Sequence, residues 1–346
     1  MPARVPRHVA TVIAAALALL AACGPQFGGS GGPSASPHND RTAPPTALKV
    51  GLGYLPSVQF APFYLAQQSR AYEGAGLEVT FENRIDPDLV TLVGQGALDI
   101  GVADGTSVIP AVSQGIPIKY VATIYGKYPS IVFAKASSGI RTAADLEGKK
   151  IGIPGRYGSS WIMLQALLDS AGLTPEDVEI VEYPDFGQGV AVQQDAVDAA
   201  TGFANNEPVQ LELEGIDTVV LPIDDVIALP GPGLISGTAM LDANNNAVAQ
   251  FISTTLSAME EIAANPEKGL EAAIVAVPEL AANRATQAAI LDATIATWAP
   301  PGGGPFGTIN EAGWEASVDY LVTLGLVPNP VSLDRLVQEV GILPVD

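Results

Sequence analysis

Short strand-like segments alternate with helix-like segments from Leu48 onward, and this alternation constrains the fold more than any other feature of the chain. LKVGLGY (48–54) is typical of a strand, and FAPFYLAQQSRAY (60–72) is typical of a helix. Further strands are expected at 77–83, 98–103 and 118–126, with helices at 87–96 and 107–115. Such alternation indicates βαβ units around a mostly parallel sheet, whose ligand site lies beyond the carboxyl ends of the strands.

A second series of the same kind begins near 131–140. Strands are expected at 149–155, 178–185, 198–204 and 217–223. A helix is expected at 159–172 and a further helix start at 174–178. QGALDIGVADG (95–105) resembles QDAVDAATGFANN (194–206), since in each a polar helix end and an Asp precede a strand that ends at small polar residues. Two similar α/β lobes would produce this repetition, and chance similarity between α/β segments is the alternative.

The sequence after Leu234 is alanine-rich and has helical periodicity. Helices are expected at 246–265, 266–277, 284–298, 310–325 and 332–340. We expect this helical part to pack back onto the first lobe, so that the second lobe is an insertion joined by two crossings. The expected lobes are 48–129 plus 231–346, and 130–230.

The N-terminus has the pattern of an export signal. Two arginines precede an uncharged apolar run, 9–20, and small residues then lead into Cys23, the only cysteine in the chain. The run is shorter than the roughly 20 residues that span a bilayer. Small residues before a cysteine resemble a bacterial lipobox, which implies cleavage before Cys23 and diacylation of its thiol; a signal that happens to contain a cysteine, or a buried thiol, is the alternative. We expect a signal peptide (1–22), then acylated Cys23 and a flexible Gly/Pro/Ser linker (23–47), which together hold the protein on the extracytoplasmic face of the cell membrane.

Charge and residue usage exclude several classes of function. Removal of 1–22 takes away two arginines and no acid, so the net charge of −21 becomes −23. This excess of acid argues against nucleic acid as a partner and against charge-driven membrane binding. Both histidines, His8 and His38, precede the folded part, which therefore lacks histidine and cysteine. His-dependent triads, Cys–His nucleophiles and ordinary zinc sites are thus excluded, and we expect neither a metal nor a cofactor.

The order of these segments resembles the extracytoplasmic substrate-binding proteins of ABC importers, in the family of thiamine-pyrimidine, riboflavin, aliphatic sulfonate and nitrate binders. The resemblance covers about 48–340 and is carried by GLGYLPSVQFAPFYLA (51–66), GALDIGVADG (96–105), DLEGKKIGIPG (145–155) and GSSWIMLQALL (158–168). It implies a two-lobed periplasmic-binding-protein fold (type II) with a ligand cleft between the lobes, closing at a hinge. Some relatives make a thiamine pyrimidine with a histidine and a cysteine-rich segment, both absent here, so we expect a binding protein and no enzyme.

Candidate ligand-binding residues in the first lobe lie where strands end at the cleft. The first loop offers an aromatic wall, Tyr54 and Phe60, and an amide, Gln59, that can donate and accept hydrogen bonds. Phe63 is expected in the core, and core packing is an equal alternative for Gln59 and Phe60. Asp104 precedes a helix, so it can cap that helix and also face a ligand. Tyr125, near the first crossing, could stack on a ring.

In the second lobe the glycines of GRYGSSW (155–161) allow a tight turn, after which Ser159 and Ser160 open a helix whose N–H groups face the cleft. Ordinary capping is the alternative for Ser159. The further candidates are Tyr157, Trp161, Asp185, Gln188, Asn206 and Glu207.

These loops hold aromatics, amides and acids but only Lys127 and Arg156 as bases, which favours a planar, neutral heteroaromatic ligand over an anion. The GRYGSSW loop resembles the riboflavin-binding branch, so riboflavin is the expected ligand. A thiamine pyrimidine precursor, a sulfonate or nitrate remains open, since Arg156 could bind an anion. An enzyme that uses carboxylates such as Asp104, Asp185 and Glu207, or a signalling receptor, is the alternative function. The expected partners are an ABC permease and its ATPase, and the expected state is a monomer.

Overall fold

The computed structural model describes residues 44–84, 88–227, 229–300, 303–327 and 329–341. The expected signal peptide, Cys23 and most of the expected linker lie outside the described residues. The first strand begins at Thr46, inside the expected linker. None of the helices in the described part of the chain combines the length and the apolar character that a bilayer crossing requires.

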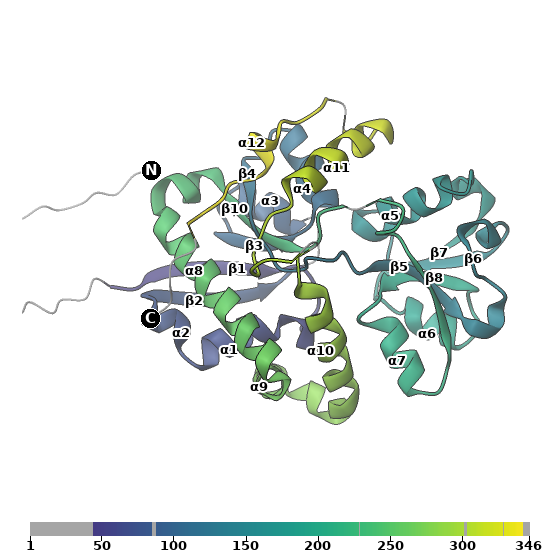
Figure 1. Ribbon diagram of the computed structural model, residues 1–346, viewed down its shortest axis with the longest axis horizontal. Coiled ribbons are helices and arrows are strands. Elements are labelled where there is room, and N and C mark those ends of the chain that lie inside the picture. The colour runs from purple at the N-terminus through teal and green to yellow at the C-terminus, as the bar shows by residue number, and fades with distance from the viewer. Residues whose placement is uncertain (1–43, 85–87, 228, 301–302, 328, 342–346) are drawn as a thin grey trace, which may run out of the picture. The chain divides into compact units, whose positions relative to one another are not determined.

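The first sheet has five strands in the order β2-β1-β3-β10-β4 (Figure 1). They are β2 (Leu77–Asn83), β1 (Thr46–Leu52), β3 (Ile100–Ala103), β10 (Gly233–Gly237) and β4 (Ile118–Thr123). β1 pairs in parallel with β2 and β3, whereas β10 pairs antiparallel with β3 and β4. The expectation of a mostly parallel sheet is confirmed, with one reversed strand that arrives from the far end of the chain.

The second sheet repeats this plan in the order β7-β6-β8-β5-β9. Its strands are β7 (Glu179–Glu182), β6 (Lys150–Ile153), β8 (Ala199–Phe203), β5 (Ser130–Lys135) and β9 (Thr218–Pro222). β6 pairs in parallel with β7 and β8, and β5 pairs antiparallel with β8 and β9. The two repeated sequence segments lead into β3 and β8, which hold the same third position in their sheets. The sequence repetition therefore corresponds to a repeated architecture. We call each sheet with the helices that cover it the first and the second lobe.

The helices cover both faces of each sheet. The first-lobe helices are α1 (Ala61–Gln68), α2 (Ala71–Gly74), α3 (Asp88–Gly94), α4 (Gly105–Ser113), α8 (Thr238–Ala264), α9 (Pro266–Ala276), α10 (Arg284–Trp298), α11 (Glu311–Thr323) and α12 (Leu333–Leu336), with the 3₁₀ turns η1 (Val58–Phe60) and η5 (Pro278–Asn283). The second-lobe helices are α5 (Gly158–Asp169), α6 (Gln188–Gln193) and α7 (Glu207–Leu213), with the 3₁₀ turns η2 (Ala136–Ser138), η3 (Ala143–Leu146) and η4 (Pro175–Asp177).

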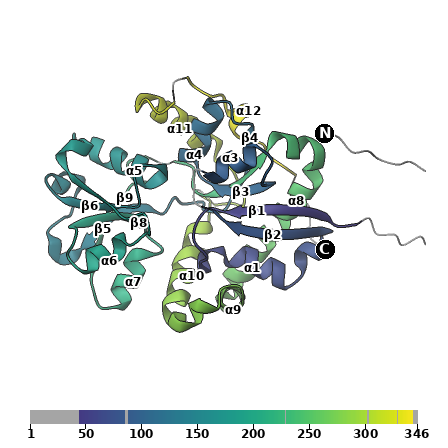
Figure 2. The same ribbon diagram turned by 180° about the vertical axis from the view of Figure 1, so that it is seen from behind.

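Separate apolar clusters lie on the two faces of the first sheet. Figures 1 and 2 show α3, α4, α11 and α12 over one face, and α1, α8, α9 and α10 over the other. Phe63 packs in the second of these layers, where its ring stacks on Phe251 at 6.2 Å between centroids. Its expected place in the core is confirmed. The second sheet is likewise covered by α5 on one face and by α6 and α7 on the other.

Two sequence-based expectations in the C-terminal part are wrong. Helix was expected to begin after Leu234, but GLISG forms β10, a fully buried strand inserted between β3 and β4. α8 follows at Thr238 and has non-helical backbone angles at Asn244, close to the expected start of the helix. The expected helix 332–340 is only the single turn α12, because Val337 leaves the helix to bridge Tyr120 of β4.

The C-terminal helices pack on the first lobe, as expected, and two of them also contact the second. α10 packs against α7, and Tyr320 of α11 packs against the apolar cluster beneath α5. Ile162 of α5 is in turn buried in the cluster of α4 and α11. The C-terminal helices therefore contact both lobes.

Candidate functional site

A pocket between the two sheets gathers most of the predicted site residues. It is lined by Gly53, Tyr54, Gln59, Phe60, Val102, Ala103, Asp104, Tyr125, Pro154, Tyr157, Gly158, Ser159, Ser160, Phe186, Gln188, Gly202, Phe203, Asn206, Glu207 and Pro232. Most of these residues follow β1, β3, β4, β6, β7 or β8, four are the last residues of β3 and β8, and Pro232 precedes β10. The site therefore lies at the carboxyl ends of the parallel strands. Its empty volume is about 1050 Å³, which includes solvent at its open mouth.

The loop after β1 supplies Tyr54, Gln59 and Phe60. Ser57 accepts a hydrogen bond from the Gln59 N–H and so caps η1, which turns the chain from the strand into α1. Gln59 and Phe60 are buried, and both also line the pocket. For these two residues the core-packing and ligand-site alternatives are therefore compatible.

Asp104 lies directly after β3 and caps α4. Its carboxylate accepts a hydrogen bond from the Thr106 N–H at 2.8 Å, as an N-cap does, and one from the Tyr128 hydroxyl at 2.8 Å. Burial raises the pKa of Asp104, whereas these hydrogen-bond donors favour the charged form and lower it. The effect of burial is the larger of the two, so the pKa lies above its ordinary value. The capping role is thus present, and the same side chain lines the pocket.

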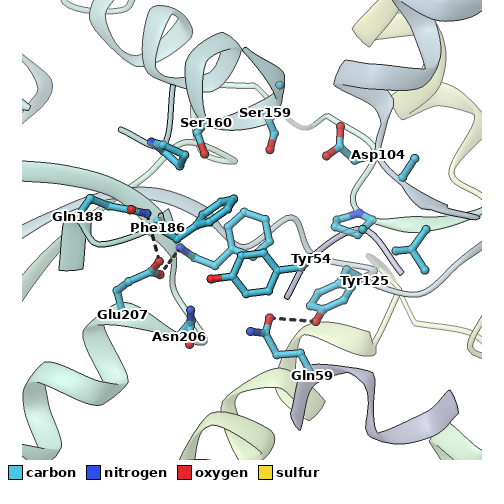
Figure 3. Close-up of a pocket in the computed structure, with 18 of the residues that line it drawn as sticks. Tyr54, Gln59, Asp104, Tyr125, Ser159, Ser160, Phe186, Gln188, Asn206 and Glu207 are labelled. Atoms are coloured by element: carbon cyan, nitrogen blue, oxygen red, sulfur yellow. Dashed lines mark hydrogen bonds between the residues drawn. The ribbon is translucent and has the colours of Figure 1, made fainter. Parts of the chain in front are cut away.

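The turn before α5 brings Tyr157, Ser159 and Ser160 to the pocket. Gly158 has a φ of +61°, in the left-handed region that favours glycine, and it redirects the chain into the helix. Tyr157 stands at the N-cap position without a capping side-chain hydrogen bond. Figure 3 shows both serines above the pocket, where their hydroxyl groups can donate to a ligand carbonyl.

Glu207 and Gln188 form the polar floor of the second lobe. The Phe203 N–H donates to the Glu207 carboxylate at 2.9 Å, and the Gln188 amide reaches the same carboxylate at 3.5 Å (Figure 3). A Cβ at Gly202 would lie 2.7 Å from a Glu207 carboxylate oxygen, so a glycine here admits that side chain. Burial raises the pKa of Glu207 from 4.5 to about 6.

An aromatic pair crosses the pocket. Tyr54 of the first lobe meets Phe186 of the second edge to face, with ring centroids 5.1 Å apart. Phe186 has a φ of +61°, which is rare for a residue with a bulky side chain, and the loop between β7 and α6 places it there. Our sequence reasoning passed over this residue, although an aromatic beside Asp185 and Gln188 in a candidate loop is the signal that identifies it.

Two candidates do not line the pocket. The Trp161 ring lies under the Arg156 guanidinium, 5.0 Å from the ring centroid, and it packs against the core beneath α5. Asp185 is exposed and accepts a hydrogen bond from the Gly187 N–H, which stabilises the turn before α6. The helical turn that points Ser159 and Ser160 inward turns Trp161 away. This geometry therefore does not support the predicted contact of Trp161 and Asp185 with the ligand.

A buried hydrogen-bond network joins the lobes beside the pocket. The Asn205 amide donates to Thr294 of α10 at 2.8 Å and to the Gln59 carbonyl oxygen at 3.2 Å. The Tyr125 hydroxyl donates to the same oxygen at 3.4 Å (Figure 3). Gln59 thus holds the two lobes together as well as facing the pocket.

The pocket is acidic. Asp104 and Glu207 line it, and none of its described lining residues is lysine, arginine or histidine. Arg156, the base that left an anionic ligand open, lies with its Nε 3.3 Å from Glu182, and Lys127 is likewise not a lining residue. In the described ranges, no three His, Cys, Asp or Glu side chains are grouped so as to hold a metal ion. The site therefore offers hydrogen-bond acceptors and apolar rings.

Comparison with known proteins places this architecture in a family. Residues 57–269 match the family described as NMT1/THI5 like. The chain is 30% identical over 309 residues to the riboflavin-binding protein RibY of Chloroflexus aurantiacus, covering 88% of each chain. It is also 30% identical over 171 residues to 4-amino-5-hydroxymethyl-2-methylpyrimidine phosphate synthase of Legionella pneumophila, covering 49% of this chain and 52% of that one.

Solved structures show the same fold. The alkanesulfonate-binding protein SsuA of Xanthomonas axonopodis, bound to MOPS, superposes with a TM-score of 0.67 at 20% identity, covering 86% of this chain and 99% of that one. The expected periplasmic-binding-protein fold is thereby confirmed. Together with the match of more than half of the sequence, it shows that the chain belongs to the NMT1/THI5-like family.

Proposed function

We propose that this protein captures riboflavin outside the cytoplasm and delivers it to an ABC permease driven by an ATPase. The observation that carries the proposal is the pocket itself, which combines aromatic rings from both lobes with amides, serines and carboxylates, and with no base among its described lining residues. Tyr54 and Phe186, which contact each other edge to face, can together form an apolar wall against a fused ring, and Asn206 can exchange hydrogen bonds with the polar edge of that ring. The likeness to a riboflavin-binding protein over 88% of each chain supports this choice.

Sulfonate and nitrate are less suitable ligands for this pocket. A buried anion needs charged or strongly donating partners, and here it would meet the carboxylates of Asp104 and Glu207. A neutral pyrimidine is the closest competitor, since the same rings and amides would serve it. The likeness to a riboflavin-binding protein over 88% of each chain favours the flavin.

Binding without turnover is the function we favour, although several relatives are named synthases. The described residues contain neither histidine nor cysteine, so acid–base chemistry in the pocket would depend on its carboxylates and tyrosines. Asp104 and Glu207 lie on opposite sides of Tyr54 and Phe186 (Figure 3). Each is held by protein donors, as expected of groups that position a ligand.

The experiment that tests the ligand is a thermal-shift panel on the full chain purified in detergent, with an absorption spectrum taken first. A flavin band in the purified protein, or a shift with riboflavin that exceeds the shifts with pyrimidines, sulfonates and nitrate, would support the proposal. A larger shift with any of the other compounds would reassign the ligand.

We also propose that Cys23 carries lipid and anchors the protein on the outer face of the cell membrane. The support is the apolar run 9–20 and the small residues before the single cysteine. Mass spectrometry of membrane fractions from expressing cells should detect an acylated peptide whose N-terminal residue is Cys23. Cys23→Ser should remove that peptide. An unmodified Cys23 inside a longer mature N-terminus would contradict the anchor.

A further inference from the structure

Two carboxylates face the pocket from opposite lobes. Asp104 follows β3 in the first lobe, and Glu207 opens α7 in the second. In Figure 3 they lie on opposite sides of the aromatic pair Tyr54 and Phe186, whose rings contact each other, so the pocket presents one acid on each side of this pair.

Both carboxylates are held in place by donors that favour their charged form. The Thr106 N–H, the Thr106 hydroxyl and the Tyr128 hydroxyl donate to Asp104 at 2.8, 2.5 and 2.8 Å. The Phe203 N–H and the Gln188 amide donate to Glu207 at 2.9 and 3.5 Å. A carboxylate has about four acceptor positions, so these donors occupy most of those on Asp104, whereas Glu207 retains acceptor capacity for a ligand hydroxyl or N–H.

No cation among the described lining residues compensates these charges. Arg156 lies beside Glu182 and over the Trp161 ring, and neither Arg156 nor Lys127 lines the pocket. The serines and the backbone N–H groups at the start of α5 can donate hydrogen bonds, but a helix N-terminus supplies only about half a positive charge, less than the two carboxylates carry.

From this arrangement we propose that Asp104 and Glu207 act as a charge filter, so that the protein accepts riboflavin and rejects its 5′-phosphate and other phosphate monoesters. This inference rests on the proposed function and defines its substrate class as non-anionic. Like charges at short range repel, and more strongly beside a buried carboxylate such as Asp104 than in bulk water, whereas ribityl hydroxyls can donate to Glu207. The two acids are specificity-determining residues that attract one form of the vitamin and repel the other.

Riboflavin and flavin mononucleotide allow a direct test because they share one fluorophore. Both are titrated with the full chain in detergent at about pH 8, where Glu207, with its pKa of about 6, is ionised. We expect the mononucleotide to bind about 100-fold more weakly or worse. Glu207→Gln and Asp104→Asn, which keep the side-chain size, should each narrow this ratio by about tenfold, whereas the exposed Glu147→Gln should leave it unchanged.

The outcomes separate this inference from the proposed function. Equal affinity for the two flavins, or a ratio unaffected by Glu207→Gln, overturns the charge filter and leaves riboflavin capture intact. Failure of both flavins to bind overturns both. Asp104 caps α4, so its variant could fail to fold. The outcome is therefore decided by the ratio of the two flavin affinities, measured on the unmodified chain and on Glu207→Gln.

Discussion

Replacing Glu207 by glutamine should change how the stability of the protein depends on pH. The Glu207 carboxylate is partly buried at the pocket floor, and burial raises its pKa from 4.5 to about 6. Glutamine keeps the size and an oxygen that can still accept the Phe203 N–H. The substitution therefore removes the ionisation and preserves the contact.

The sign and the size of the effect follow from the pKa. The folded state binds the proton more tightly than the unfolded chain, so stability falls as the pH rises from about 4.5 to about 6 and remains lower above that. The full difference corresponds to about 2 kcal/mol, an upper bound because the pocket is open to water. About 1 kcal/mol of it falls between about pH 5 and about pH 7.5.

Urea unfolding, followed by tryptophan fluorescence at about pH 5 and about pH 7.5, measures this difference. The unmodified protein should lose about 1 kcal/mol more than Glu207→Gln between the two conditions. Glu147→Gln, at an exposed site in the same lobe, serves as the control for the loss of one negative charge from this acidic chain. Parallel pH profiles for the unmodified protein and the Glu207 variant would refute the reasoning that burial raises this pKa.

Three further predictions concern the pocket and its surroundings. Phe186→Ala removes the ring that meets Tyr54 at 5.1 Å and should weaken riboflavin affinity about tenfold to 100-fold by fluorescence titration, and an unchanged affinity would remove this ring from the site. Asn205→Ala removes two buried hydrogen bonds between the lobes and should lower the free energy of unfolding by about 2 kcal/mol in urea, so a loss well under 1 kcal/mol would show that the network adds little. Asp185→Asn, outside the pocket, should leave riboflavin affinity within about twofold, and a larger loss would return Asp185 to the site.

Sequence patterns predicted the elements whose signals are local. The strand 77–83 and the helix 284–298 have the expected bounds because each carries its periodicity within one continuous segment. The strand 233–237 is different, since GLISG is short, rich in glycine and buried on both sides. Only its partners β3 and β4, distant in sequence, make it a strand. The helix expected at 332–340 was lost to a tertiary contact of the same kind, between Val337 and Tyr120.

The candidate site was predictable to the extent that strand ends define it. Asp104, Gln188 and Glu207 were found because they follow or precede predicted strands, and the pocket does collect them. The rotation of α5 about its axis determines which of its first residues line the pocket. Ser159 and Ser160 face the pocket, whereas Trp161 faces the core and Arg156. The inward turn of Phe186 depends on a left-handed backbone at that residue, which residue type alone does not indicate.

Titration of riboflavin fluorescence with the full chain purified in detergent tests the central claim most directly. Rings that flank the flavin quench its emission, so capture by this pocket predicts saturable quenching at one site per chain. The dissociation constant should be about 1 μM or tighter, as a closed pocket with flanking rings and satisfied polar contacts can provide. Emission that stays unquenched with the protein in excess, at concentrations of about 100 μM, would contradict riboflavin as the ligand.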